Sequence, residues 1–234
     1  MRNRNLLNLA LALLMLGINA VHSQPVDYVS LWQGEDNALD ATGTNNGTLI
    51  GDATFAAGKV GQAFSLDGSG DMVRMADSPR LDITGSMTIS AWFKTDVNEK
   101  SGMILTKLDN WAAYSSYQLV LLGRDNECGS AANKAGCNGA VIAIFRNANG
   151  SQAVAGSWRN NGLPGTPPLN DGEWHHVVAR FDAGIDGGTG RASLYVDGAF
   201  VHESSQTIHA MSTNNLPVTI GGRKNPGSPS WNGG

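Results

Sequence analysis

The oxygen-bearing side chains of Glu35, Asp40 and Asn46 fall within one loop that is rich in glycine and asparagine. Calcium prefers several oxygen ligands from carboxylates, amides and backbone carbonyls, and one loop can supply them at close range. These three residues are therefore candidate metal ligands, with calcium as the expected cofactor. The alternative is that Asp40 and the asparagines only cap turns, through hydrogen bonds between side chain and backbone.

Aromatic side chains beside polar groups suit sugar binding, because an aromatic ring offers an apolar face next to groups that bind hydroxyls. Trp111 and Tyr114 lie in one candidate loop, and Trp158 lies in another. We take these three residues as candidate ligand-binding residues. Each tryptophan could instead cover the underside of its loop. Trp92 and Trp174 fall within strand patterns and are predicted to lie in the core.

Catalytic patterns are missing from the sequence. It contains neither the Gly-x-Ser-x-Gly turn of serine hydrolases nor the His-Glu-x-x-His motif of zinc proteases. Glu173 precedes a strand, but no acid follows two residues later, so the carboxylate pair of a glycosidase is not formed there. His175 and His176 are neighbours on a strand and point to opposite faces, so they cannot bind one ion together. The sequence predicts a protein that is not an enzyme.

The first residues have the layout of a secretory signal peptide. Arg2 and Arg4 precede an apolar run over 6–18, and small residues stand before a cleavage point ahead of Gln24. The run is too short for a comfortable membrane span. We predict a signal peptide over 1–23 and a secreted or extracellular mature chain with no membrane span. An uncleaved anchor or a buried helix is the alternative.

The sequence holds two cysteines, Cys128 and Cys137. In the oxidising compartment that export implies, they are expected to form a disulfide with each other. The residues between them are small and polar, so the bond would cross-link a surface loop. A two-cysteine metal site or a catalytic thiol is less favoured.

Composition indicates one domain over 24–234. The 234 residues are 41% hydrophobic and 15% charged, which is enough for a sizeable core. The net charge of −4 lacks the excess of positive charge that is typical of nucleic-acid-binding domains, so nucleic acid is not an expected partner.

Short strands separated by turns predict an all-β fold. Period-two alternation over 86–94 and 175–181 is typical of half-buried strands. Asp197-Gly198 between two apolar runs predicts a tight hairpin. The further expected strands are 26–32, 103–106, 117–122, 140–145, 193–196, 199–201 and 217–220. This pattern predicts a two-sheet antiparallel β-sandwich.

Four stretches resemble the laminin G-like jelly-roll family of concanavalin A-like lectins and glucanases. They are Trp32-Gln33-Gly34-Glu35 through Leu49, Gly58-Lys59-Val60-Gly61-Gln62-Ala63-Phe64, Met87-Thr88-Ile89-Ser90-Ala91-Trp92-Phe93, and Gly172-Glu173-Trp174-His175-His176 with Tyr195-Val196-Asp197-Gly198. The resemblance implies a jelly roll with one convex and one concave sheet.

The same resemblance bears on calcium and on the end of the chain. Many relatives hold calcium near the Glu35–Asn46 loop, with help from an acidic residue on a last strand that begins with an aromatic-x-Gly element. Here Trp231-Asn232-Gly233 looks like the start of that element, and the sequence stops at Gly234. We therefore expect a fragment that lacks its last strand. A domain completed by a partner's strand is the alternative.

The expected function is a secreted, non-catalytic binding module within a larger extracellular protein, with carbohydrate or a protein surface as its partner. The first alternative is a structural or adhesion spacer without a small ligand. The second, less favoured, is a glycoside hydrolase-like enzyme. Fold analogy alone does not separate these roles, because jelly rolls host many of them.

Overall fold

Strands make up most of the regular structure in the computed structural model, which describes residues 28–97, 100–108, 116–123, 137–157, 167–184, 189–204 and 206–222. They are β1 (Gly47–Ile50), β2 (Thr54–Ala57), β3 (Gln62–Ser65), β4 (Met72–Met75), β5 (Met87–Phe93), β6 (Gly102–Thr106), β7 (Tyr117–Leu121), β8 (Val141–Arg146), β9 (Gln152–Gly156), β10 (His175–Asp182), β11 (Arg191–Val196), β12 (Ala199–Glu203) and β13 (Val218–Ile220).

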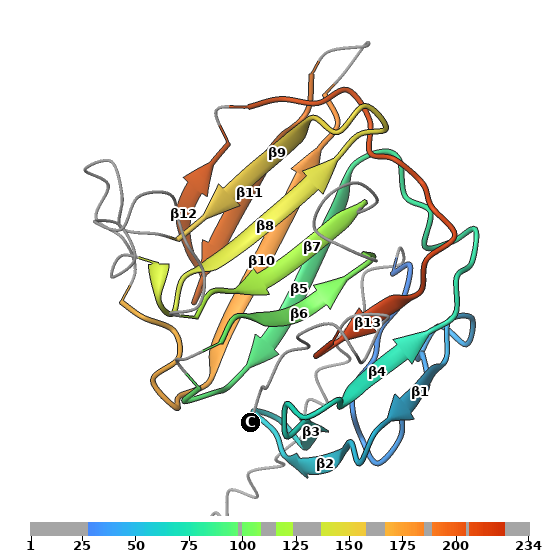
Figure 1. The fold of residues 1–234 in the computed structure, drawn as a ribbon, viewed down its shortest axis with the longest axis vertical. Helices are drawn as coiled ribbons and strands as arrows, with labels where there is room; N and C mark the ends of the chain where they lie inside the picture. Colours follow the sequence, from blue (N-terminus) through green and yellow to red (C-terminus); the bar gives the residue numbers. More distant parts are fainter. Residues whose placement is uncertain are drawn as a thin grey trace, which may run out of the picture.

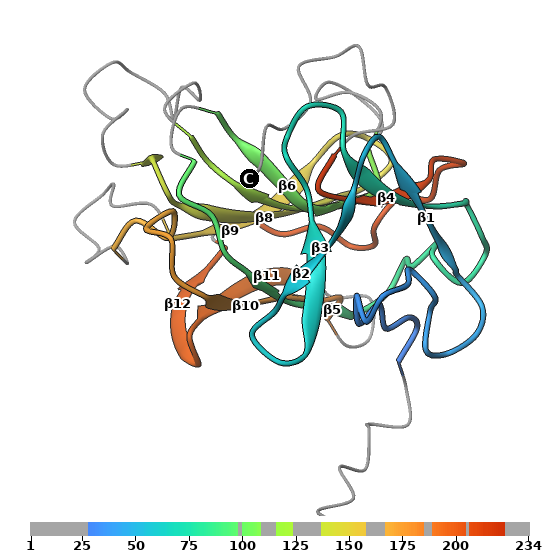
Figure 2. The ribbon, with the colours of Figure 1, turned by 90° about the horizontal axis from the view of Figure 1, so that it is seen from below.

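Two sheets lie face to face. A seven-stranded sheet has the order β1-β4-β13-β6-β7-β8-β9, and a four-stranded sheet has the order β12-β11-β10-β5 (Figure 1). A separate hairpin pairs β2 with β3, and every strand pair is antiparallel. Figure 2 shows the two layers edge-on, with the four-stranded sheet below. The all-β, two-sheet antiparallel sandwich expected from the sequence is confirmed.

The core lies between the two sheets, where one face of each strand is apolar. Ile89 and Phe93 of β5 are buried, and so are Val177 and Phe181 of β10. The ring of Phe181 stacks on that of Phe145 in β8, with centroids 5.3 Å apart, so the two sheets are in direct contact. Burial of such side chains stabilises the fold by about 2 kcal/mol each.

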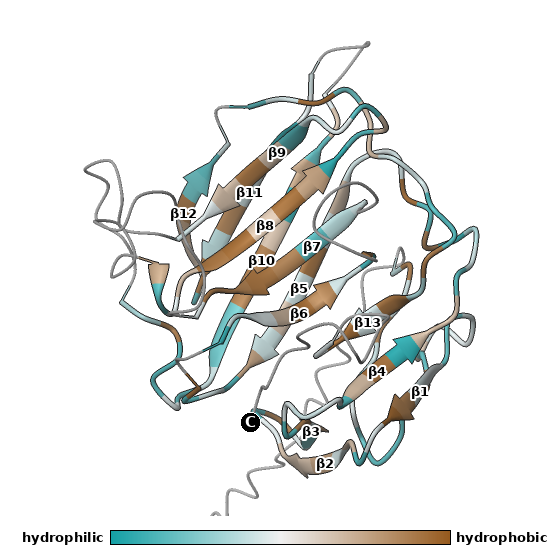
Figure 3. Cartoon of the chain, viewed as in Figure 1, coloured by the Kyte–Doolittle hydropathy of each residue, from teal (hydrophilic) through white to brown (hydrophobic). Residues whose placement is uncertain are grey.

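Strands β7 and β8 are buried on both faces. A second apolar cluster covers their far side, formed by Met103, Val120, Leu122, Cys137, Ala140, Ile142 and Ile144. Double burial explains why the sequence of these strands shows continuous apolar runs instead of alternation. Figure 3 shows the hydrophobic colour along much of β8.

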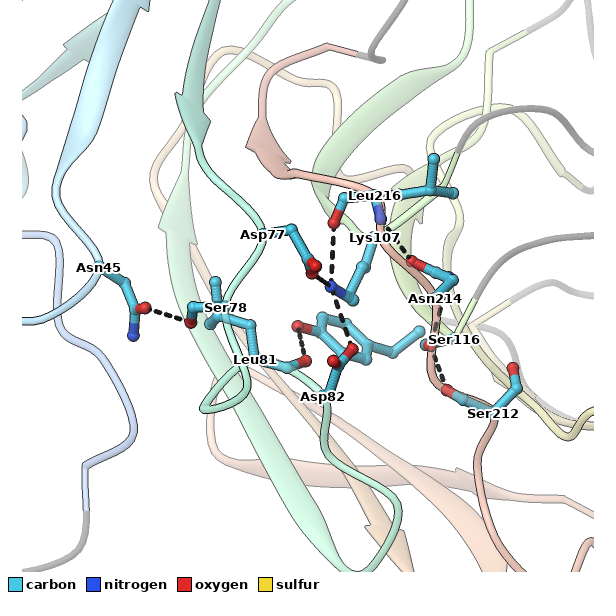
Figure 4. Close-up of polar contacts among 11 residues, drawn as sticks. Asn45, Asp77, Ser78, Leu81, Asp82, Lys107, Ser116, Ser212, Asn214 and Leu216 are labelled. Atoms are coloured by element: carbon cyan, nitrogen blue, oxygen red, sulfur yellow. Dashed lines mark hydrogen bonds and ion pairs between the residues drawn. The ribbon is translucent and has the colours of Figure 1, made fainter.

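A buried lysine joins three loops at one end of the sandwich. Lys107, directly after β6, is fully buried, and its ammonium group contacts the carboxylates of Asp77 and Asp82 (Figure 4). The same group donates to the carbonyl oxygen of Leu216 at 2.9 Å. The ammonium group therefore has two hydrogen bonds and a second ion pair, and this pairing offsets much of the cost of burying its charge.

Tyr117 extends this cluster. Its hydroxyl donates to the Leu81 carbonyl oxygen at 3.0 Å. Burial, together with the negative charges of Asp82 and Asp77, raises the pKa of the Tyr117 phenol. The hydroxyl therefore stays protonated and keeps this hydrogen bond over the physiological pH range.

The structure differs from the strand expectations in two ways. Over 28–32, the described part of the first expected strand, no ladder forms, and Trp32 makes only an isolated bridge to Asp40. The expectation of a strand there was wrong because these residues bond to the turn after them, with Leu31 N–H donating to Asp40 Oδ1. The sequence patterns also did not reveal β1 to β4 or β9.

Within the described ranges, no helix is long and apolar enough to span a membrane.

Candidate functional site

The outer face of the four-stranded sheet carries a row of aromatic and hydroxyl groups. Across the strands, Ser90 pairs with Val178, Val178 with Tyr195, and Tyr195 with Phe200. The rings of Tyr195 and Phe200 meet edge to face, with centroids 5.5 Å apart, and Phe200 is 59% exposed. The alternate residues of the same strands are buried in the core, so this row points away from it.

Trp92 lies at the β5 end of this face. Its ring stacks on that of His176, the residue directly opposite in β10, with centroids 4.9 Å apart. Ser90 Oγ lies 2.9 Å from Nε2 of His176, which fixes the imidazole plane. Lys59, in the turn between β2 and β3, places its ammonium nitrogen 5.2 Å from the centroid of the Trp92 ring.

The prediction that Trp92 lies in the core was wrong, because its side chain is 48% exposed. Ile89 and Phe93 face inward, and the period of two then requires Trp92 to face outward. The alternation of β5 is visible in the sequence, and it decides the direction of Trp92 in spite of the apolar character of tryptophan. Trp174, in contrast, is partly buried.

A hollow of about 1500 Å³ runs along β5, and its lining includes the β2–β3 hairpin, residues 28–33 and inward-facing residues of both sheets. Its polar and aromatic lining residues include Lys59, Ser90, Trp92, Lys94 and His176. Trp92 and Tyr28 are both exposed in this lining. A concave surface with exposed aromatic rings and a few convergent polar groups is the usual form of a ligand site.

His175, the neighbour of His176, is held between two carboxylates. Its Nδ1 lies 2.8 Å from Asp197 Oδ2, and its Nε2 lies 3.1 Å from Asp171 Oδ1. Partial burial lowers the pKa of His175, but the hydrogen bonds to Asp197 and Asp171 outweigh it, so the net pKa is raised above 6.5. The pKa of Asp171 is lowered first by the backbone N–H of Glu173 and then by His175. Partial burial raises the pKa of Asp197, but its hydrogen bonds with His175 and the backbone N–H of His176 outweigh this and lower it.

The local backbone positions Asp197 for this role. Asp197 and Gly198 form the β11–β12 turn and both have positive φ, 49° and 81°, as the predicted Asp-Gly hairpin requires. Asp197 Oδ1 accepts the backbone N–H of His176 at 2.8 Å. The turn is therefore tied to the start of β10, next to the Trp92–His176 pair.

The candidate calcium ligands are only partly brought together. Asp40 is buried, and its two oxygens accept the backbone N–H groups of Leu31, Thr42 and Asn45 and the hydroxyl of Thr42. Burial raises the pKa of Asp40, but these hydrogen bonds outweigh it and lower the pKa to about 2. A carboxylate has about four lone-pair sites, and Asp40 uses four.

The other two residues make different contacts. Asn46 Oδ1 accepts the backbone N–H of Asp40 at 3.0 Å, so these two residues do meet. Both carboxylate oxygens of Glu35 lie 3.2 Å from the backbone nitrogen of Gln62 in β3. The contacts of Asp40 and Asn46 are those of turn capping, and calcium at this loop stays a prediction.

A second group of acids could hold a metal ion. Asp52, Asp67 and Asp71 place carboxylate oxygens within 4.8 Å of one another. Asp71 is buried, and its oxygens accept the backbone N–H groups of Asp52 at 2.9 Å and Asp67 at 3.0 Å. Sequence reasoning missed this group, although Asp67-Gly68-Ser69-Gly70-Asp71 is a compact acidic loop.

The remaining predicted site residues are Trp111, Tyr114, Trp158 and Cys128, which lie outside the described residues. Cys137 is fully buried and is not a free thiol. Its pairing with Cys128 stays a prediction.

Comparison with known proteins places the chain in a family. A laminin G model, described as the concanavalin A-like lectin/glucanases superfamily, matches residues 67–234. The chain belongs to this superfamily. The laminin G-like relationship expected from the sequence motifs is thereby confirmed. No curated protein matches the chain.

Several solved structures have a fold similar to that of this chain. The binding domain of Paraclostridial Mosquitocidal Protein 1 matches with a TM-score of 0.57 and 14% identity, over 84% of this chain and 45% of that one. The receptor binding domain of botulinum neurotoxin D gives 0.54 and 17%, over 84% and 44%. The serotype D domain in complex with N-acetylneuraminic acid gives 0.53 and 17%, over 82% and 42%.

This chain spans less than half of the length of each of these binding domains. At such low identity the likeness concerns the fold.

Proposed function

We propose that this protein is a secreted, non-catalytic binding module that recognises carbohydrate through the outer face of its four-stranded sheet. The observation that carries the proposal is Trp92, whose ring is about half exposed and braced from one side by His176. A rigid aromatic ring next to hydroxyl and amine groups suits the apolar face and the hydroxyls of a sugar.

The charged groups on this face support a binding role over a catalytic one. Its carboxylates include Asp182, 2.7 Å from Arg180, and Glu203, 2.8 Å from Arg191. A retaining or inverting glycosidase needs two carboxylates facing each other across the sugar, one of them kept as an acid. Carboxylates that pair with arginines do not suit that acid role.

The fold relatives add support of a general kind. One botulinum neurotoxin serotype D binding domain has been solved with N-acetylneuraminic acid. It shows that a domain of similar fold can bind a sugar.

Trp92→Ala tests the proposal. Binding of the purified protein to a panel of immobilised oligosaccharides is measured first, and the affinity for each binder is then compared between the wild type and the variant. We expect the variant to lose about tenfold or more in affinity while its melting temperature changes little, since the ring is half exposed. Leu39→Ala is the matched control, because Leu39 is 58% exposed and does not line the hollow.

Two results would count against the proposal. Failure of the folded wild type to bind any saccharide favours a structural or adhesion spacer. Release of reducing sugar from a β-glucan favours an enzyme.

Secretion is part of the same proposal and rests on the first 23 residues. Sequencing the N-terminus of the exported protein should give Gln24 as the first residue, and retention of Met1 would contradict it.

A further inference from the structure

We propose that the Trp92 surface selects saccharides that carry an anionic group, a carboxylate or a sulfate, and that Lys59 and Lys94 bind this group. The inference rests on the proposed carbohydrate-binding function and adds the class of ligand. It starts from the position of two lysines around one exposed aromatic ring.

Both lysines lie at the Trp92 end of the hollow. Lys59 is exposed in the β2–β3 turn, and its ammonium nitrogen lies 5.2 Å from the ring centroid of Trp92. Lys94 follows β5 two residues after Trp92, is exposed, and lines the same hollow. The two ammonium groups thus come from different elements, a hairpin turn and the end of a sheet strand.

Neither ammonium group is neutralised by the protein. Over the part of the chain that the structure describes, Lys59 and Lys94 form no ion pair, whereas Arg180 pairs with Asp182 and Arg191 with Glu203 on the same sheet. The hollow also contains Glu35 and Asp96. The carboxylate of Glu35 accepts the backbone N–H of Gln62, and it forms no ion pair with Lys59 in the described part of the chain.

The charge of the whole molecule makes two lysines without an ion pair more informative. The chain carries a net charge of −4, so a polyanion is not attracted to it as a whole. Exposed charges are screened beyond about 8 Å at physiological ionic strength. Recognition of an anion therefore depends on cations in direct reach of the stacked sugar, which is where these lysines lie.

Lysine suits this task because its ammonium group is a point charge on a flexible stem. It can follow a carboxylate or a sulfate at different positions on a sugar ring. The cation–π contact to Trp92 holds Lys59 beside the ring in the free protein. An arriving anion replaces that contact with a charge-assisted hydrogen bond, while the sugar ring covers the aromatic surface.

Calorimetric titration with two matched pairs of oligosaccharides tests the inference. One pair is oligogalacturonate and its neutral methyl ester, and the other is a sulfated galactan oligomer and its desulfated form. We expect the anionic member of at least one pair to bind roughly fivefold tighter at low salt, with the difference shrinking as sodium chloride is added. The pair that shows the preference identifies carboxylate or sulfate as the group recognised.

The variants Lys59→Gln and Lys94→Gln should each reduce this preference, because the affinity for the anionic member falls more than the affinity for the neutral member. Trp92→Ala should weaken both members of a pair. Arg74→Gln, which removes an exposed positive charge from β4 in the other sheet, is the matched control and should behave as the wild type.

The possible outcomes distinguish failure of the anion preference from failure of the proposed carbohydrate-binding function. Equal affinity for neutral and anionic members, with loss in Trp92→Ala, overturns the anion preference and leaves carbohydrate binding standing. A preference that survives in both lysine variants also overturns it. Failure of every oligosaccharide to bind the folded protein overturns the proposed function and the inference together.

Discussion

His175 donates from Nδ1 to Oδ2 of Asp197 across 2.8 Å and so ties the start of β10 to the β11–β12 turn. Its other ring nitrogen faces Asp171 at 3.1 Å. A neutral imidazole has one N–H, so satisfying both carboxylates requires the protonated ring. The charged groups in contact with His175 are these two aspartates, and the ring of Phe93 lies on its remaining side at 6.0 Å between centroids.

Stability should therefore depend on pH around the titration of His175. Its pKa is raised in the folded protein, so its contribution is complete below pH 6.5 and is lost as the pH rises through the folded pKa. We expect unfolding in urea at pH 5.5 to need about 0.5–1 kcal/mol more than at pH 8.5 through this contact, since the aspartates are half exposed.

The variant His175→Gln should remove that difference, and His209→Gln, at an exposed site, should keep it. The two aspartates act in the opposite direction: their pKa values are lowered, so their contribution is lost as the pH falls below 3.8. An unchanged pH profile in His175→Gln would show that the contacts of His175 with the two aspartates do not contribute to stability.

Replacing the buried lysine should destabilise the fold strongly. Lys107→Met removes the cation that contacts Asp77 and Asp82 and leaves two carboxylates that are only 30% and 25% exposed. Uncompensated burial of charge of this kind costs about 3 kcal/mol. Urea denaturation measures the loss, with Arg191→Met as a control whose exposed ion pair to Glu203 should cost less than about 1 kcal/mol. Equal losses in the two variants would refute the structural role of Lys107.

Calcium removal tests the metal prediction made for Glu35, Asp40 and Asn46. If the ion binds, the melting temperature should be higher in calcium than in chelator, with a gain of about 2.7 kcal/mol at a hundredfold excess over Kd. Glu35→Gln should abolish the gain, and it avoids disturbing the turn that Asp40 holds.

Asp52→Asn locates the ion. Loss of the gain in this variant but not in Glu35→Gln would assign calcium to the Asp52, Asp67 and Asp71 group. Identical melts in calcium and chelator would contradict calcium binding at either place.

The predicted disulfide can be tested by thiol labelling. In the exported, folded protein we expect no reaction at Cys128 or Cys137 before reduction and labelling of both after reduction and unfolding. The bond closes a short loop, so reduction should lower stability by about 2–3 kcal/mol at most. Labelling of Cys128 in the native protein would show that the pair is not formed.

The strands that the sequence predicted are those with a clear burial pattern. β5 and β10 alternate because one face of each packs on the core, and β7 and β8 are continuously apolar because both faces are covered. β1 and β3 have four residues each and no fully buried residue, so neither periodicity nor apolar content marks them. Their pairing depends on distant partners, such as β4 for β1.

The site was harder to predict than the fold. The outward direction of Trp92 followed from the alternation of β5, but its neighbours did not. His176 reaches it through the register of β5 and β10, and Lys59 comes from a hairpin far away in the sequence. Spacing along one chain carries no information about such cross-element contacts. The role of Asp40 as a turn cap, in contrast, was already an open alternative because Asp, Asn and Gly share its loop.

The position of β13 has a consequence for how the protein is made. This strand lies inside the seven-stranded sheet, between β4 and β6, where Thr219 pairs with Arg74 on one side and with Thr106 on the other. Strands β4 and β6 are synthesised first, and their facing edges lack a hydrogen-bonding partner until residues 218–220 have been synthesised. Closing so distant a contact is slow. During synthesis, the growing chain therefore passes through a stage in which the facing edges of β4 and β6 are unpaired.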